Sequence, residues 1–93
     1  MQNLKKISKL VKNLHSEVEI EMFLKELLTE SEIATLSKRW HILDLMSKSY
    51  TQRDIAKRLQ VSLCKVTRGS KILKNKDSII AKFLQEEKDN EIN

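Results

Sequence analysis

The residues in this sequence best suited to chemistry are positively charged side chains that gather in one stretch. Nine Lys and Arg residues lie between Lys48 and Lys76, and Asp54 is the only acidic residue among them. This stretch carries a net charge of +8 while the whole chain carries +5, so the rest of the chain is net negative. Clustered Lys and Arg side chains are typical of a surface that binds nucleic-acid phosphates. The alternative is a set of merely solvated lysines, and the clustering argues against it.

Two short helices joined by a tight turn would carry these charges. Ile55 and Leu59 are four residues apart, on one helical face, and Ser62 can cap a second helix from Leu63 to about Lys71. The positions expected to face inward are Ile55, Ala56, Leu59, Val61 and Val66. The positions expected to face outward are Gln52, Arg53, Lys57, Arg58, Lys65, Thr67, Arg68 and Lys71. This pattern is typical of a helix-turn-helix, here over about residues 51–72, whose second helix enters the DNA major groove.

The remaining sequence predicts an all-α chain of about six helices. It contains no Pro and one Gly, which favours helices with few sharp turns. Residues 3–14 fit a basic amphipathic helix, and we favour packing against a partner subunit over binding to a membrane surface. Capping-box spacings begin helices after Ser16, Thr29 and Thr51, and Asp77 could cap the last helix. We expect one domain over residues 1–93.

The third predicted helix, to about Ser47, has a wide apolar face. Its main stripe and the residues that widen it are Ile33, Leu36, Trp40, Ile42, Leu43, Leu45 and Met46. We expect Trp40 in the core. A face this wide on a chain of 93 residues needs covering from more than one side, which favours a dimer with a shared helical core.

Specific residues give the chain a resemblance to the tryptophan repressor family over roughly residues 17–85. They are Leu28 and Thr29, Leu36 with Arg39, and the string VTRGSKILK at 66–74, preceded by Gln52 and Arg53. The resemblance implies an intertwined all-helical homodimer. It also implies a transcriptional repressor of tryptophan biosynthesis or uptake genes, which binds L-tryptophan as corepressor and then a palindromic operator.

The resemblance also implies a tryptophan site. Arg39 and Arg68 would flank the indole, and Arg68 would also hold the carboxylate with the Thr29 hydroxyl. Carbonyls near Leu27 and Leu28 would accept the ammonium, and Gly69 would let the backbone approach the ligand. The chemistry agrees, because a guanidinium both pairs with carboxylates and stacks on aromatic rings. Thr29 has a second interpretation, as a helix cap alone.

The DNA-contacting residues divide into two groups under this hypothesis. Those facing the major groove are Leu63, Cys64, Lys65 and Thr67, beside the capping residue Ser62. Those near phosphate are Arg53, Lys57 and Lys71, together with Gln52. Base contacts can be partly water-mediated in this family. The two recognition helices of a dimer would lie about 34 Å apart, one turn of DNA.

Two other functions fit the sequence. The first is a related helix-turn-helix protein that needs no corepressor, such as a transposase-associated or constitutive regulator. It is motivated by the connection between Arg39 and Thr51, which is one residue shorter than in the family, and by Ile72, which replaces a small polar residue. A separate departure from the family is Gln60, which replaces Gly in the turn. The second is a helical interaction module whose basic patch binds an acidic protein.

Several classes of function are not predicted. No nucleophile–base pair, Gly-rich phosphate loop or H-E-x-x-H motif is present, so we expect no enzyme, and neither His has a second ligand at metal spacing. We therefore expect no cofactor other than the tryptophan ligand. A single Cys suits a reducing compartment, and no signal peptide or apolar span is seen. We expect a cytoplasmic protein.

Overall fold

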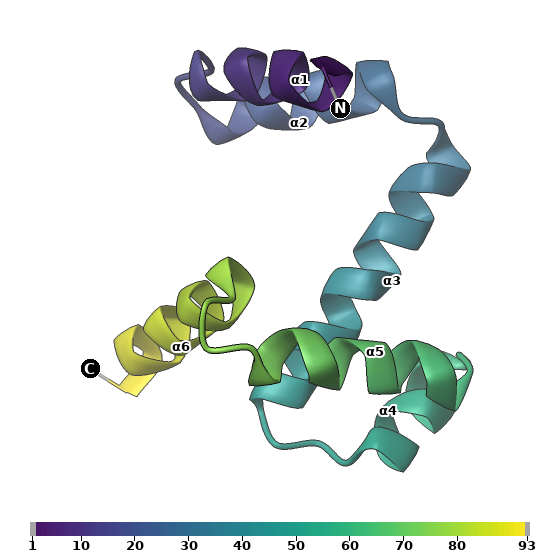
Figure 1. Ribbon diagram of the computed structural model, residues 1–93. Coiled ribbons are helices and arrows are strands. Elements are labelled where there is room, and N and C mark those ends of the chain that lie inside the picture. Colours follow the sequence, from purple (N-terminus) through teal and green to yellow (C-terminus); the bar gives the residue numbers. More distant parts are fainter. Residues whose placement is uncertain (1, 93) are drawn as a thin grey trace. The chain divides into compact units, whose positions relative to one another are not determined.

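The computed structural model describes residues 2–92, and every regular element in that range is an α-helix. The six helices, labelled in Figure 1, are α1 (Gln2–Lys12), α2 (Glu17–Leu27), α3 (Glu30–Ser47), α4 (Gln52–Leu59), α5 (Leu63–Lys74) and α6 (Ile79–Ile92). The all-α prediction is confirmed. No helix in residues 2–92 is both long enough and apolar enough to cross a bilayer.

Side-chain caps begin the helices where the spacing of the sequence predicted them. Ser16 Oγ accepts from the Glu19 amide at 3.2 Å, and Thr51 Oγ1 accepts from the Asp54 amide at 3.1 Å. Thr29 forms the full reciprocal box, because its Oγ1 accepts from the Glu32 amide at 3.1 Å and its own amide donates to Glu32 Oε1 at 2.9 Å. These bonds satisfy amides that have no partner within the helix.

The last helix is capped differently from the prediction. Ser78 Oγ accepts from the Ala81 amide at 3.0 Å, while the Asp77 amide donates to Asn75 Oδ1 at 2.9 Å. The prediction that Asp77 caps this helix is therefore wrong. Because α6 begins at Ile79, Ser78 occupies the N-cap position and Asp77 lies one residue too early.

The chain divides into two compact units between Ala34 and Thr35. One domain over residues 1–93 stays a prediction. The first unit contains α1, α2 and the first turn of α3. Neither α1 nor α2 contains a buried residue, and Val18 and Met22 are 65% and 60% exposed. The first unit therefore has no core of its own within the described residues of a single chain.

The second unit has its core where α3, α4 and α5 meet. Ile42, Ile55 and Val66 are buried at its centre, and the last two are completely inaccessible. Partly buried residues pack around them: Leu45, Met46, Tyr50, Ala56, Leu59 and Val61. All five residues predicted to face inward in the stretch 51–70 lie in this cluster. In Figure 1, α5 packs against both α4 and α6.

Trp40 lies outside this core. Its side chain is 42% exposed, and its ring contacts Phe83 of α6 with centroids 5.9 Å apart and planes tilted by 58°. The prediction of a core Trp40 is wrong for the single chain, because the apolar face of α3 splits. Ile42 and Leu43 are buried, whereas Leu36 and Trp40, one turn apart, stay exposed.

Candidate nucleic-acid interface

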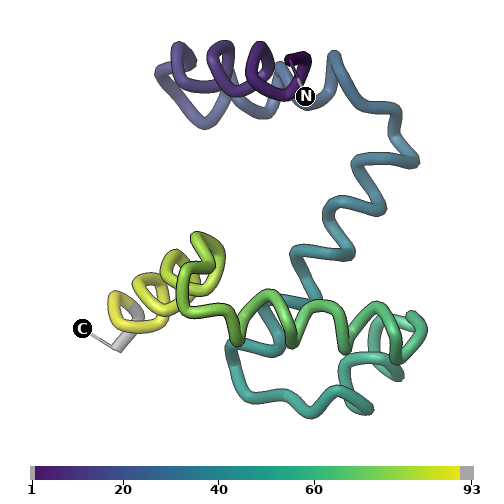
Figure 2. Tube along the Cα trace, in the orientation of Figure 1, coloured from purple at the N-terminus to yellow at the C-terminus, as the bar shows by residue number. Residues whose placement is uncertain are grey.

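Helices α4 and α5 are joined by a turn of three residues, which Figure 2 traces through residues 60–62. Gln60 closes α4 in the left-handed region, with φ 54° and ψ 48°, and the Val61 amide donates to the Ala56 carbonyl at 3.1 Å. The half-buried Val61 packs onto the core. Ser62 then caps α5, since its Oγ accepts from the Lys65 amide at 3.3 Å. The turn is therefore tight although it contains no Gly.

Burial divides α5 into two faces. Val66, Gly69 and Ser70 are buried, with the spacing of three and four residues that places side chains on one side of a helix. The opposite side is exposed, and its residues are Leu63, Cys64, Lys65, Thr67, Arg68 and Lys71. All four residues predicted to face the major groove lie on this exposed side.

Most of the basic side chains on α4 and α5 are exposed and unpaired. Each of the following forms no ion pair with any residue from 2 to 92: Arg53, Lys57, Lys65, Arg68 and Lys71. Positive charge that is exposed and not neutralised by neighbouring carboxylates remains available to an anionic partner.

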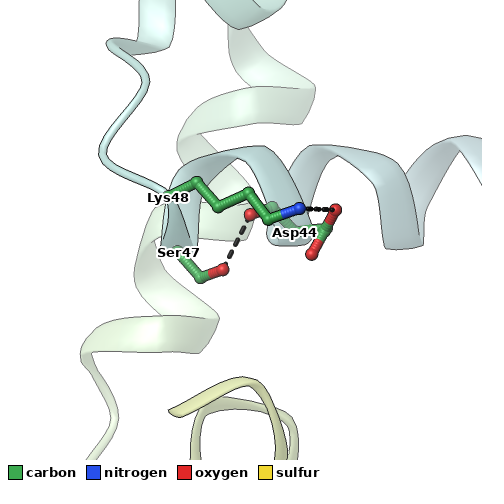
Figure 3. A network of polar contacts seen from close by, with 3 residues as sticks. All are labelled: Asp44, Ser47 and Lys48. Carbon is green, nitrogen blue, oxygen red and sulfur yellow. Dashed lines mark hydrogen bonds and ion pairs between the residues drawn. The ribbon is translucent and has the colours of Figure 1, made fainter. Parts of the chain in front are cut away.

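Two other basic residues of the stretch are engaged within the chain. Lys48 Nζ lies 3.3 Å from Asp44 Oδ2 at the end of α3, where Ser47 Oγ also donates to the Asp44 carbonyl at 2.7 Å (Figure 3). Arg58 lies 3.7 Å from Asp54 and stacks 4.8 Å from the centre of the Tyr50 ring. The sequence placed Arg58 with the other outward cations and did not predict these contacts.

The first turn of α5 is uncharged apart from Lys65. Leu63 is 49% exposed, and Cys64 is an exposed free thiol beside it. Both side chains are therefore available for contact with a partner surface. Small and apolar side chains contact the thymine methyl group in the major groove.

One hydrogen bond joins the exposed edges of α4 and α5. Thr67 Oγ1 donates to Gln52 Oε1 at 3.0 Å. Sequence reasoning assigned both residues to the DNA-facing surface but missed this bond. The two residues are 15 positions apart on different helices, and helical periodicity contains no information on such a pair.

The residues predicted for tryptophan lie in both units. Leu27, Leu28 and Thr29 belong to the first unit, and Arg39, Arg68 and Gly69 belong to the second. Both arginines are exposed and without an ion pair among residues 2–92. The cap role of Thr29 is present, as described above, and its role toward a ligand stays a prediction.

Gly69 has a packing role that the sequence did not indicate. It is buried on α5, and a Cβ at this position would lie 3.2 Å from Ile42 Cγ2 and 3.3 Å from Leu43 Cδ2. The absence of a side chain therefore lets α5 approach α3 closely. The predicted approach of a ligand to the Gly69 backbone stays untested.

A pocket of about 310 Å³ lies between the end of α3, α5 and α6. Its lining includes the apolar residues Met46, Leu73 and Leu84 and the basic residues Lys74 and Lys88. None of the predicted tryptophan-binding residues lines it. Residues 2–92 contain no group of three or more His, Cys, Asp or Glu side chains placed to hold a metal ion.

Comparisons with known proteins agree on one family. The family model described as Trp repressor protein matches residues 2–88. A protein named Trp operon repressor homolog from Chlamydia trachomatis serovar D is 39% identical over 77 residues, which cover 77% of this chain and 82% of that protein. The homolog from serovar A gives the same values, and the one from serovar L2 is 38% identical over the same shares. No solved structure was found to match the chain.

Proposed function

The chain belongs to the Trp repressor family, a family of DNA-binding regulators, and from this we propose that it is a transcriptional repressor. It binds a palindromic operator as a homodimer and takes L-tryptophan as its corepressor. The observation that carries this proposal is the row of exposed, unpaired cations on α4 and α5, within a chain matched by the family model over residues 2–88. The free Cys64 thiol suits action in the reducing cytoplasm.

The exposed side of α5 is the proposed reading surface. Its 12 residues form a helix about 18 Å long, which suits the major groove. Leu63, Cys64, Lys65 and Thr67 would face the bases from its N-terminal half. Arg53, Lys57 and Lys71 would neutralise phosphates on either side. Phosphate contacts of this kind position the protein, and base-edge contacts give it sequence preference.

A homodimer would cover the apolar surface that a single chain leaves exposed. In the first unit this surface includes Val18 and Met22, and in the second unit it includes Leu36, Trp40 and Phe83. Large apolar residues exposed in each unit are the kind that a protein interface buries. Two copies related by a two-fold axis present two α5 helices, which matches a palindromic operator with half-sites about 34 Å apart.

L-Tryptophan is proposed as corepressor because the chain offers the three groups that this ligand needs. Arg39 and Arg68 are unpaired guanidinium groups that can sandwich the indole, and Arg68 can pair with the carboxylate. Carbonyls at the end of α2, near Leu27 and Leu28, can accept the ammonium. Tryptophan would act by binding better to the arrangement of α4 and α5 that fits the operator.

Calorimetry with L-tryptophan tests the ligand assignment directly. We expect micromolar affinity, about 7–8 kcal/mol. Arg68→Ala should abolish binding because it removes both the carboxylate partner and one face of the indole site. Lys38→Ala removes one exposed cation from α3 and serves as the matched control, with unchanged affinity. A wild-type chain that gives no heat at millimolar tryptophan, or an Arg68→Ala variant with wild-type affinity, would contradict the assignment.

DNA binding is tested by selecting duplexes from a random pool and measuring affinity against salt. The logarithm of the binding constant should fall by about 0.9 per logarithm of salt for each phosphate neutralised. A basic patch that binds an acidic protein would instead bind DNA weakly and without sequence preference. Affinity for the selected duplex should rise when tryptophan is added at fixed salt.

A corepressor-independent regulator is the second candidate. Ile72 is half-buried on α5 at the position where the family has a small polar residue, and it can offer the ligand carboxylate no hydrogen bond. The shortened connection before Thr51 also contains a left-handed residue, Ser49, with φ 71°. Under this candidate, affinity for the selected duplex is the same with and without tryptophan.

A further inference from the structure

The hydrogen bond between Thr67 and Gln52 suggests how the two helices of the interface act together on DNA. Resting on the proposed function, we propose that Thr67 is a positioning residue that holds the Gln52 carboxamide ready to donate to a DNA phosphate. Thr67 Oγ1 donates to Gln52 Oε1 at 3.0 Å. The Thr67 hydroxyl hydrogen is thus used on Gln52, and Gln52 makes the phosphate contact, while Thr67 can still face the bases through its methyl group, which Thr67→Val keeps.

The geometry leaves the amide nitrogen of Gln52 available. Its Oε1 is occupied by Thr67, while its Nε2 makes no hydrogen bond with any residue from 2 to 92. A primary amide has two N–H donors on that nitrogen. Because the oxygen is turned toward Thr67, the nitrogen is turned away from it, so the side chain presents donors and no acceptor on its free side. A phosphate oxygen accepts such donors.

The residues next to Gln52 and Thr67 include cations that would attract a phosphate. Arg53 follows Gln52 on α4, and Arg68 and Lys71 follow Thr67 on the exposed side of α5. Gln52 itself is half-buried, which limits the conformations of its side chain. A glutamine has three rotatable side-chain bonds, and a free one would lose more entropy on binding than one already held by a neighbour. The bond to Thr67 therefore pre-organises a neutral phosphate donor among cations.

A double-mutant cycle on Gln52 and Thr67, with DNA affinity as the measured quantity, tests this role. The probe is a labelled copy of the duplex selected from the random pool, measured by fluorescence anisotropy with excess L-tryptophan at several salt concentrations. Gln52→Met should weaken binding about 5-fold per half-site, the value of one hydrogen bond, which is about 25-fold for a dimer on two half-sites, and Thr67→Val should weaken it by at most the same factor. The double variant should be about as weak as Gln52→Met alone, because the Thr67 hydroxyl acts only through the phosphate contact that Gln52 makes. The salt slope should stay unchanged, since neither residue carries a charge.

Conservative variants separate positioning from general structure. Thr67→Ser keeps the hydroxyl and should retain binding. Gln52→Glu keeps an acceptor for Thr67 but has no donor and adds a negative charge, so it should fold normally and bind less well than Gln52→Met. Gln85→Met makes the same side-chain change on α6, where Gln85 Nε2 donates to Asp89, and should bind as the wild type does.

Three results would overturn the inference while the proposed function stands. They are single-variant effects that multiply in the double variant, a Thr67→Val variant with wild-type affinity, and a Gln52→Glu variant that binds as the wild type does. A wild-type chain that does not bind the selected duplex, either with or without L-tryptophan, would overturn the proposed function and this inference with it.

Discussion

Gln60 adopts a backbone conformation that residues other than Gly and Asn rarely adopt. Its φ of 54° lies in the left-handed region, where a Cβ crowds the following carbonyl. Gln60→Gly should therefore stabilise the protein by about 0.5–1 kcal/mol, the relief of crowding less the entropy of the more flexible unfolded chain. Urea unfolding followed by circular dichroism measures this change.

The matched control places the same substitution in a helix. Gln85 lies inside α6, so Gln85→Gly should cost about 1 kcal/mol. If Gln60→Gly also destabilises the protein, the left-handed conformation of residue 60 is not the one populated in solution.

Gly69 is needed for packing in the second unit, because α5 lies close to α3 at this residue. Gly69→Val would push two methyl groups into the space of Ile42 and Leu43, which a Cβ alone already approaches to 3.2 and 3.3 Å. The free energy of unfolding should fall by about 1–3 kcal/mol. Cys64→Val puts the same side chain on the exposed side of α5 and should change stability by less than about 0.5 kcal/mol. Equal effects at the two positions would contradict the packing argument.

Residue-level prediction succeeded where the controlling interaction is local. The spacing of Thr29 and Glu32 determines a reciprocal cap within four residues, and the structure has it. It failed for Trp40, because helical periodicity tells which residues share a face but contains no information on which element covers that face. The Gln52–Thr67 bond was missed for the same reason, since it depends on how two helices cross.

At the scale of the helix, Ser62 has two functions that a single substitution can separate. Its Oγ caps α5, and it lies at the end of α5 proposed to face DNA. Ser62→Asp should keep the cap and match the helix dipole, so stability should not fall. It also adds a negative charge facing the phosphates, so DNA affinity should fall about 5- to 10-fold.

Ser62→Ala provides the opposite combination. Losing the cap should cost about 1 kcal/mol of stability, while DNA affinity should change less than in Ser62→Asp. Thermal unfolding and anisotropy on the same samples measure both quantities. Unchanged DNA affinity in Ser62→Asp would place the N-terminus of α5 away from DNA, and a loss of its stability would contradict the cap.

Helix positions were predicted better than helix ends. The sequence placed the second helix of the basic stretch from Leu63 to about Lys71, and α5 continues to Lys74. No Gly or Pro follows Lys71 before Asn75, so nothing in the backbone stops the helix earlier. The opposite faces of α5, with Val66 inward and Lys65 and Lys71 outward, followed directly from the helical period.

At the scale of the whole molecule, one chain leaves several large apolar residues uncovered. Phe83 and Trp40 are 40% and 42% exposed although they pack against each other, and Leu36 extends the same surface on α3. The sequence predicted a wide apolar face and inferred a second copy from it. The operator sequence and the identity of the ligand are properties of the molecules that the protein binds. Neither can be derived from the helical periodicity of one chain.

The proposed homodimer gives the last prediction. Phe83→Glu places a charge within this apolar surface, and burying an unpaired charge in an interface is costly. Sedimentation equilibrium should find the wild-type chain dimeric at micromolar concentration, and Phe83→Glu should raise the dissociation constant by at least about 30-fold. Lys82→Glu, at the neighbouring exposed position on α6, adds a carboxylate outside the apolar surface and should leave the dimer intact. A monomeric wild-type chain would leave only one α5 per molecule, and binding to a palindrome would then gain nothing from symmetry.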